Sequence, residues 1–235
     1  MYTDSLMGLD TDSFLKEMIK IQASSTMAAL PAGALGVIVQ DNMPVGANGA
    51  AGPSNWQTEV IALKKKIKDH LSVGFDNFPD VLRLLLKQDC ILSGSSISSI
   101  YHNEEVKDYD FWMKPDVFVN ADNIRKNTVE KYSDAILCIS EKYGDGMNSV
   151  PCVTPNAITF KNKFQLITLG DYHSERKNFD FLHCTPYYDL HTDKFYISER
   201  QFYAIRDKKL IVHSKTRKVS DYRIQKFTGR GWRAE

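Results

Sequence analysis

Two carboxylates, Asp108 and Asp110, have the clearest capacity for chemistry in this sequence, and they lie in the run Lys107-Asp108-Tyr109-Asp110-Phe111-Trp112. Side chains two positions apart on a strand project from the same face, so both carboxylates point one way while Tyr109 and Phe111 point the other. Two convergent carboxylates form a hard-oxygen site of the kind that binds Mg²⁺ or Mn²⁺. A solvated strand edge with no ligand is the alternative for this pattern alone.

A second candidate site comes shortly before that run. An apolar segment, Ile91-Leu92-Ser93, leads into Gly94-Ser95-Ser96. A residue without a Cβ lets phosphate oxygens approach the backbone, and the small side chains after it can begin a helix whose free N–H groups bind anions. A Gly-Ser pair by itself is also typical of an ordinary turn. Acting together, the two motifs would hold a nucleoside triphosphate and neutralise its charge.

The combination resembles the signature of the nucleotidyltransferase superfamily that includes DNA polymerase beta. That signature is an apolar residue, Gly-[Gly/Ser], a short spacer, and then acid-apolar-acid-apolar; the spacer here is the 12 residues from Ser96 to Lys107. The run at 107–111 is similar to the K-D-[IY]-D-F of the head domain of CCA-adding enzymes and poly(A) polymerases. Segments 179–189, 198–212 and 222–231 are similar to later blocks of that branch, in the same order.

This resemblance implies a nucleotidyltransferase fold and a set of site residues. Asp108 and Asp110 would bind the metal, and Gly94, Ser95 and Ser96 would contact the triphosphate. Asp180 would be a third acidic residue, on a strand after 164–168, that helps to activate the acceptor. From the residues alone, Asp180 is equally well explained as a strand-edge acid paired with Arg176 or Lys177.

The implied activity is Mg²⁺- or Mn²⁺-dependent transfer of a nucleoside monophosphate from ATP or another triphosphate to a hydroxyl of RNA, a protein or a small molecule, releasing pyrophosphate. The sequence departs from the CCA-adding branch by having Ser95 and Ser98-Ser99 where that branch has a second Gly and an Arg-Asp pair, and by lacking an Arg before Asp180. It also ends where that branch adds helical domains, so a CCA-adding enzyme is not expected. A catalytically inactive fold kept as a binding or assembly module is therefore the alternative function.

The periodicity of the sequence predicts an α/β or α+β fold, with a mixed sheet flanked by helices. Apolar residues recur at helical spacing over 55–72 and 79–88, and a longer helical pattern covers 121–143. Short runs rich in β-branched and aromatic residues predict strands. These strands are expected at 90–92, 108–112, 157–160, 164–168, 179–183 and 209–212, and a last helix is expected at 222–230.

Residues 1–54 are expected to be an extension to a single domain at 55–235. The extension contains a predicted helix at 11–22 and an Ala-, Gly- and Pro-rich segment at 28–53. Such a segment is typical of a flexible tether. Its apolar island, 35–39, offers a second interpretation, in which it adds as a strand to a protein partner.

Basic residues are concentrated toward the C-terminus. Residues 200–235 contain eleven Lys and Arg residues against three acidic ones, although the whole chain has Lys+Arg 30 and Asp+Glu 29. Arg223, Lys226 and Arg230 are spaced to share one face of the predicted helix, where they would bind nucleic-acid phosphates. An exposed helix surface is the alternative, and a general nucleic-acid binder is a third possible function.

Composition excludes several classes of protein. With 43% hydrophobic and 25% charged residues, the 235-residue chain is typical of a globular protein, and it has no apolar run that could span a bilayer. The four cysteines and six histidines show no zinc-ligand spacing. The acidic N-terminus does not resemble a signal peptide, so a cytoplasmic location is expected. The tether and small size are similar to those of proteins of large bacterial viruses, which would place the chain in the host cytoplasm or the virion.

Overall fold

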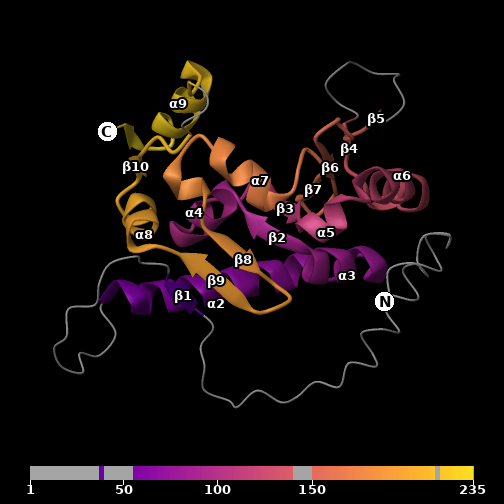
Figure 1. Ribbon diagram of the computed structural model, residues 1–235, viewed down its shortest axis with the longest axis horizontal. Coiled ribbons are helices and arrows are strands. Elements are labelled where there is room, and N and C mark those ends of the chain that lie inside the picture. Colours follow the sequence, from indigo (N-terminus) through magenta and orange to yellow (C-terminus); the bar gives the residue numbers. More distant parts are fainter. Residues whose placement is uncertain (1–36, 40–54, 140–149, 215–217, 235) are drawn as a thin grey trace, which may run out of the picture.

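A seven-stranded mixed sheet organises the computed structural model, which describes residues 37–39, 55–139, 150–214 and 218–234 (Figure 1). Its strands lie in the order β1-β9-β8-β2-β3-β7-β6. They are β1 (Val37–Val39), β2 (Cys90–Ser93), β3 (Tyr109–Met113), β6 (Ala157–Thr159), β7 (Phe164–Ile167), β8 (Tyr187–Asp189) and β9 (Lys194–Ile197). The expected α/β class, a mixed sheet flanked by helices, is confirmed.

The described helices occur between and after these strands. The longer ones are α2 (Asn55–Phe75), α3 (Asp80–Asp89), α6 (Ala121–Lys131), α8 (Glu199–Arg206) and α9 (Asp221–Thr228). Shorter ones are α4 (Ser95–Tyr101), α5 (Pro115–Phe118), α7 (Tyr172–Glu175) and the 3₁₀ turns η1 (Ser133–Ala135), η2 (Arg176–Asn178) and η3 (Leu182–Cys184). Two small sheets pair β4 (Cys138–Ile139) with β5 (Val150–Pro151) and β10 (Lys209–Leu210) with β11 (Arg233–Ala234).

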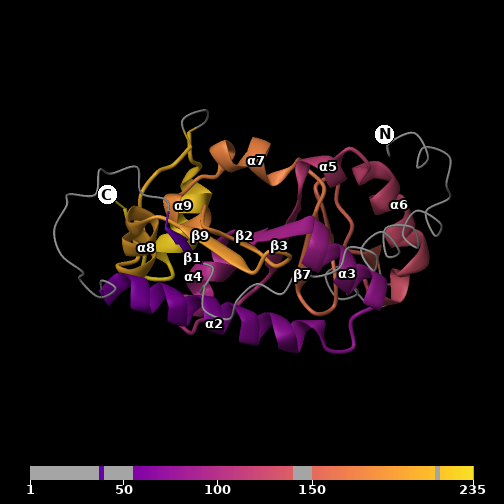
Figure 2. The same ribbon diagram turned by 60° about the horizontal axis from the view of Figure 1, so that its bottom comes forward.

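The main hydrophobic core lies between the sheet and the helices α2 and α3, which run along one of its faces (Figure 2). Alternation in β3 sends Phe111 into this core, where its ring lies 4.9 Å from that of Phe164 on β7 and 6.1 Å from that of Phe75 on α2. The opposite face of the sheet carries Asp110 and Trp112 and lies on the side of α7 (Figure 2). The core therefore fixes which face of β3 is left for a site.

Antiparallel pairing of β2 with β3 brings the two candidate motifs together. Ser93 lies opposite Asp110 in the register, so the turn at Gly94 begins beside the carboxylates. The parallel pairing of β3 with β7 places Gln165 opposite Asp110 on the other side. Three neighbouring strands, β2, β3 and β7, thus bring Ser93, Asp110 and Gln165 side by side in the sheet.

Three of the expected elements are wrong. Residues 179–183 are not a strand: apart from one bridge between Phe181 and Val212, they form a bend followed by η3. The helical pattern over 121–143 ends at Lys131, after which η1 and β4 follow. The last helix ends at Thr228, because the chain turns at Gly229 and Gly231, so Arg230 lies beyond it.

The apolar island of the N-terminal extension is placed in this chain's own sheet. Its residues Val37–Val39 form β1 and pair in parallel with β9. The expected helix at 11–22, and the rest of the extension at 1–36 and 40–54, lie outside the described residues. In the part of the chain that the structure covers, no helix combines the length and apolar character needed to cross a bilayer.

Candidate active site

A pocket of about 510 Å³ opens on the face of the sheet opposite the main core. Residues from β3, the β2–α4 turn, β7, α7 and α9 surround it. Its walls are formed by Gly94, Ser95, Asp108, Asp110, Trp112, Gln165, Leu169, Glu175, Asn178, Phe179, Asp180, Cys184, Arg223, Lys226 and Phe227. A volume of this size is within the range of small-molecule and cofactor sites.

Asp108 and Asp110 both lie in this pocket, on the same side of the chain, as the alternation of the sequence predicts. Tyr109 and Phe111 are buried in the main core on the other side. Among the described residues, no group of three or more His, Cys, Asp or Glu side chains could hold a metal ion. Within the described part of the chain, Asp108 and Asp110 are the pair of pocket carboxylates that the sequence motif puts forward as metal ligands.

Gly94 lies directly against one of these carboxylates. Its backbone has φ 101° and ψ −164°, and a Cβ built on it would lie 2.5 Å from Oδ2 of Asp110. Its N–H donates to the carbonyl of Cys184. Ser95 lines the pocket, whereas Ser96 does not: it is buried, and its hydroxyl has no partner within the described part of the chain. The turn thus brings Gly94 and Ser95, but not Ser96, to the pocket.

Asp180 reaches the pocket from the bend before η3 rather than from a strand. Its carboxylate, 6% exposed, accepts a hydrogen bond from Nε of Arg223 at 2.8 Å. The partner expected from the neighbouring sequence was Arg176 or Lys177, but the ion pair is instead formed with α9, 43 residues further along the chain. Arg223 and Lys226 therefore supply positive charge to the pocket, where both act on Asp110.

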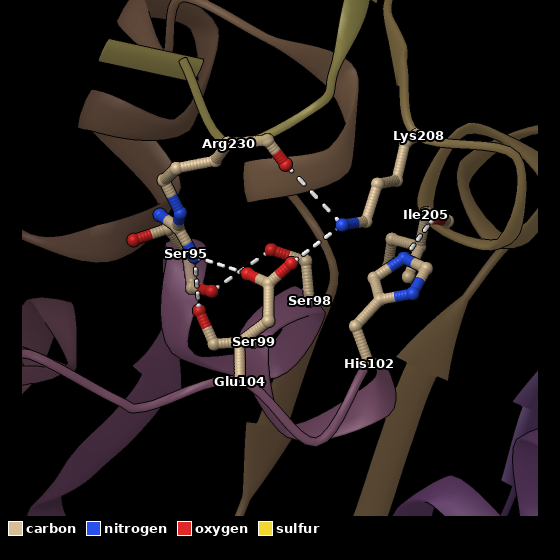
Figure 3. Close-up of polar contacts among 8 residues, drawn as sticks. All are labelled: Ser95, Ser98, Ser99, His102, Glu104, Ile205, Lys208 and Arg230. Carbon is tan, nitrogen blue, oxygen red and sulfur yellow. Dashed lines mark hydrogen bonds and ion pairs between the residues drawn. The ribbon is translucent and has the colours of Figure 1, made fainter. Parts of the chain in front are cut away.

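Arg230, the third basic residue of the expected nucleic-acid face, is engaged inside the protein (Figure 3). It donates to the hydroxyl of Ser99 and to the carboxylate of Glu104, both at 2.7 Å. Lys208 donates to the other oxygen of Glu104 at 2.6 Å and to the carbonyl of Arg230. This network ties the C-terminal segment to α4, next to the Gly94 turn, and so holds α9 and its two cations at the pocket.

The Glu104 network predicts a pH-dependent contribution to stability. Burial alone would raise the pKa of Glu104, but the hydrogen bonds from Lys208 and Arg230 hold it below its ordinary value. Stability from such a group is present above its unfolded pKa and is lost as the pH falls through its folded pKa. We expect Glu104→Gln to lower the free energy of unfolding by about 1–3 kcal/mol at pH 7, in urea titrations, and by much less at pH 3.

The neighbouring residue Glu105 provides the matched control for this prediction. Its side chain is 82% exposed and forms an ion pair with Lys163. Exposed ion pairs of this kind contribute about 0–1 kcal/mol. A loss from Glu105→Gln as large as that from Glu104→Gln would contradict the role given to the network.

Burial and the charges around the pocket shift the pKa of Asp110. Burial, and next the charge of Asp108, raise the pKa of Asp110 to about 7, while Lys226 and Arg223 act in the opposite direction. A carboxyl whose folded pKa exceeds its unfolded value destabilises the folded state as the pH rises between the two. The pocket therefore holds a carboxylate whose charge is poorly compensated by the protein alone.

Asp110→Asn removes that charge at every pH. We expect the variant, in buffer with a chelator, to be more stable than the unmodified chain above pH 7, by about 2–4 kcal/mol, because each pKa unit corresponds to about 1.4 kcal/mol. The difference should become small near pH 4, where Asp110 is protonated in the folded state and about half protonated in the unfolded state. Thermal unfolding across pH 4–8 measures it; equal stability at pH 8 would contradict the assigned cause.

Several pocket residues were not predicted from the sequence as parts of a site. They are Trp112, Gln165, Glu175, Asn178 and Phe179. Trp112 continues the alternation of Asp108 and Asp110, so its position on the pocket face could have been predicted. Gln165 is brought in by the β3–β7 register, and Glu175 and Asn178 by short helical turns that carry no local signal.

The chain is similar to one described protein family and, at low identity, to two solved structures. A family model described as "Gabija anti-defense 2 family protein" matches residues 62–208. The solved Thermotoga maritima CCA-adding enzyme in complex with tRNA is similar at 14% identity and a TM-score of 0.42, over 70% of this chain and 42% of that one. A CCA-adding enzyme in its apo form is similar at 11% identity and 0.40, over 76% and 40%. The chain thus spans less than half the length of either enzyme, and no curated protein matches it.

Proposed function

The chain belongs to the Gabija anti-defense 2 family, and from that premise we propose that it is a metal-dependent nucleotidyltransferase that modifies a component of the defence named in the family's description. The reaction would move a nucleoside monophosphate from a triphosphate to a hydroxyl group. The pocket at Asp108 and Asp110 would be its active site, and the modified component would lose its activity.

One observation carries this proposal: two carboxylates, a glycine turn and two cations share one pocket. Gly94 approaches Asp110 so closely that a Cβ there would lie 2.5 Å from Oδ2, so a residue without a side chain is needed where the turn passes the carboxylate. Arg223 and Lys226 supply positive charge in the same pocket. This combination of acidic and basic groups suits a phosphate ester bound through a cation.

The donor set fits Mg²⁺ or Mn²⁺. Mg²⁺ is commonly held by one or two carboxylates, with waters and substrate phosphates completing its shell, so Asp108 and Asp110 are sufficient protein ligands. Burial, and next the charge of Asp108, raise the pKa of Asp110, and a bound cation would favour its ionised form. Held by Asp108 and Asp110, such an ion would neutralise phosphate charge and polarise the phosphoryl oxygens.

The remaining residues have roles in binding and in proton transfer. Arg223 and Lys226 would hold the β- and γ-phosphates, and Ser95 would lie beside them. Asp180, oriented by Arg223, would take the proton of the acceptor hydroxyl. The acceptor oxygen then bonds to the α-phosphorus, the bond from that phosphorus to the bridging oxygen breaks, and pyrophosphate leaves.

A second function, binding without catalysis, is favoured by a specific observation. Asp180 is paired with Arg223, and Gln165 rather than an acid lies opposite Asp110 in the sheet. A pocket in which Asp180 is engaged by Arg223 in this way is compatible with a module that holds a nucleotide, or a partner, without transferring anything.

The deciding experiment is transfer of label from α-labelled ATP, CTP, GTP and UTP, with Mg²⁺ or Mn²⁺, to lysates of cells with and without the Gabija defence. We expect a labelled band only in the lysate that contains the defence, and its sensitivity to nuclease or protease identifies the acceptor as RNA or protein. Triphosphate binding by calorimetry without any transfer would favour the binding module instead. If the chain neither binds a triphosphate nor transfers label, both proposed functions are overturned.

A further inference from the structure

One end of the pocket is aromatic, and nothing in the proposed chemistry uses it. Phe179 is half-buried and lines the pocket beside Trp112. The centroids of the two rings lie 5.1 Å apart, with an interplanar angle of 43°. We propose that this end is a nucleobase subsite, in which the base of the bound nucleotide stacks on Phe179. The proposal rests on the proposed function, because the phosphates at the other end would place the base.

Phe179 is backed by a rigid aromatic layer. Tyr172 packs edge-on to it, with centroids 6.2 Å apart, and is itself fully buried with its hydroxyl donated to the carbonyl of Thr185. Behind Tyr172, Tyr187 stacks on Tyr196 at 4.4 Å. Because these rings are fixed by packing, the exposed part of Phe179 is a preorganised surface, and little entropy is lost when a flat ligand covers it.

The spacing of the two ends suits a nucleotide. Asp110 and Trp112 are two residues apart on the same face of β3, a separation of about 6.7 Å along the strand. One ribose would bridge an α-phosphate at the carboxylates and a base at the aromatic end. Gln165 and Asn178 line the same pocket, where their amide groups are held by hydrogen bonds to Thr159 and Glu175. Every base has a π-face, so stacking on Phe179 favours nucleotides over phosphate compounds without a base.

The test is calorimetric binding of tripolyphosphate and of ATP, CTP, GTP and UTP to the full chain with Mg²⁺. We expect at least one nucleotide to bind about tenfold more tightly than tripolyphosphate, as base–aromatic stacking supplies. Phe179→Leu should remove this advantage and leave tripolyphosphate binding unchanged. Phe179→Tyr, which keeps the ring, should restore it, and Phe179→Met serves as the ring-free variant if the leucine variant does not fold.

Tyr222→Leu is the matched control, because Tyr222 is an exposed aromatic residue of α9 that does not line the pocket. It should change neither affinity. Equal binding of tripolyphosphate and all four nucleotides overturns the subsite and leaves the proposed function standing. Binding of free nucleosides through Phe179, with no binding of tripolyphosphate, supports the subsite and overturns the proposed function. No binding of any ligand overturns both.

Discussion

Asp108→Asn is expected to reduce nucleotidyl transfer on the order of a thousandfold. The substitution keeps the size of the side chain and removes one of the two carboxylates that the described residues offer to a metal ion in the pocket. Charge stabilisation by a bound metal is worth several kcal/mol in a transition state, and each 1.4 kcal/mol corresponds to a factor of ten in rate. The measurement is single-turnover transfer from the α-labelled triphosphate that gives the strongest signal.

Asp122→Asn is the control for this prediction, because Asp122 is an exposed acid on α6 that does not line the pocket. It should transfer label at the unmodified rate. Thermal unfolding of Asp108→Asn shows whether the variant is folded, so that lost activity is assigned to the carboxylate. A folded Asp108→Asn chain that transfers label at more than a tenth of the unmodified rate would contradict the assignment of Asp108 as a metal ligand.

The part of the site that could be predicted from the sequence is the part formed by near neighbours. Strand alternation alone places Asp108 and Asp110 on one face, because the period of two is a property of the backbone. The turn at Gly94 follows from a short apolar run that ends in a residue without a side chain. Both were predicted, and the antiparallel register between Ser93 and Asp110 then brings them together.

The rest of the site depends on contacts between distant segments. Residues 179–183 alternate like a strand, yet Phe181 and His183 are buried in a second core beneath α9 rather than in a ladder. Burial, and next the charges of Arg230 and Arg223, lower the pKa of His183 to about 3, so it stays neutral there. Tertiary packing against α9 therefore buries Phe181 and His183, and it outweighs the local strand preference of this segment.

The same limit applies to the basic C-terminus. Helical spacing predicted one phosphate-binding face for three residues, but the structure divides them: Arg223 and Lys226 line the pocket, and Arg230 is bonded to Glu104 and Ser99. Spacing within a helix defines which side chains share a face only as far as the helix extends. The helix ends at Thr228, directly before Gly229, and glycine is common just after the last residue of a helix.

Gly94→Ala is expected to lower the free energy of unfolding by about 2–4 kcal/mol and to abolish transfer. The backbone of Gly94, at φ 101° and ψ −164°, lies in a region that residues with a Cβ rarely adopt, at a cost of about 1–3 kcal/mol. The added Cβ would also lie 2.5 Å from Oδ2 of Asp110, so the carboxylate must move out of place. Urea unfolding measures the first effect, and the transfer assay measures the second.

Two variants separate backbone strain from this steric contact. Gly231 also has a positive φ, 82°, but a Cβ there meets only Nζ of Lys208 at 4.0 Å, so Gly231→Ala reports strain with little contact, about 1–2 kcal/mol. Asp110→Ala removes the atom that the new Cβ would meet. In that background the cost of Gly94→Ala should fall toward the Gly231→Ala value, because contacting residues give non-additive energies. An unchanged cost would show that strain alone, and not the approach of the turn to the carboxylate, requires glycine here.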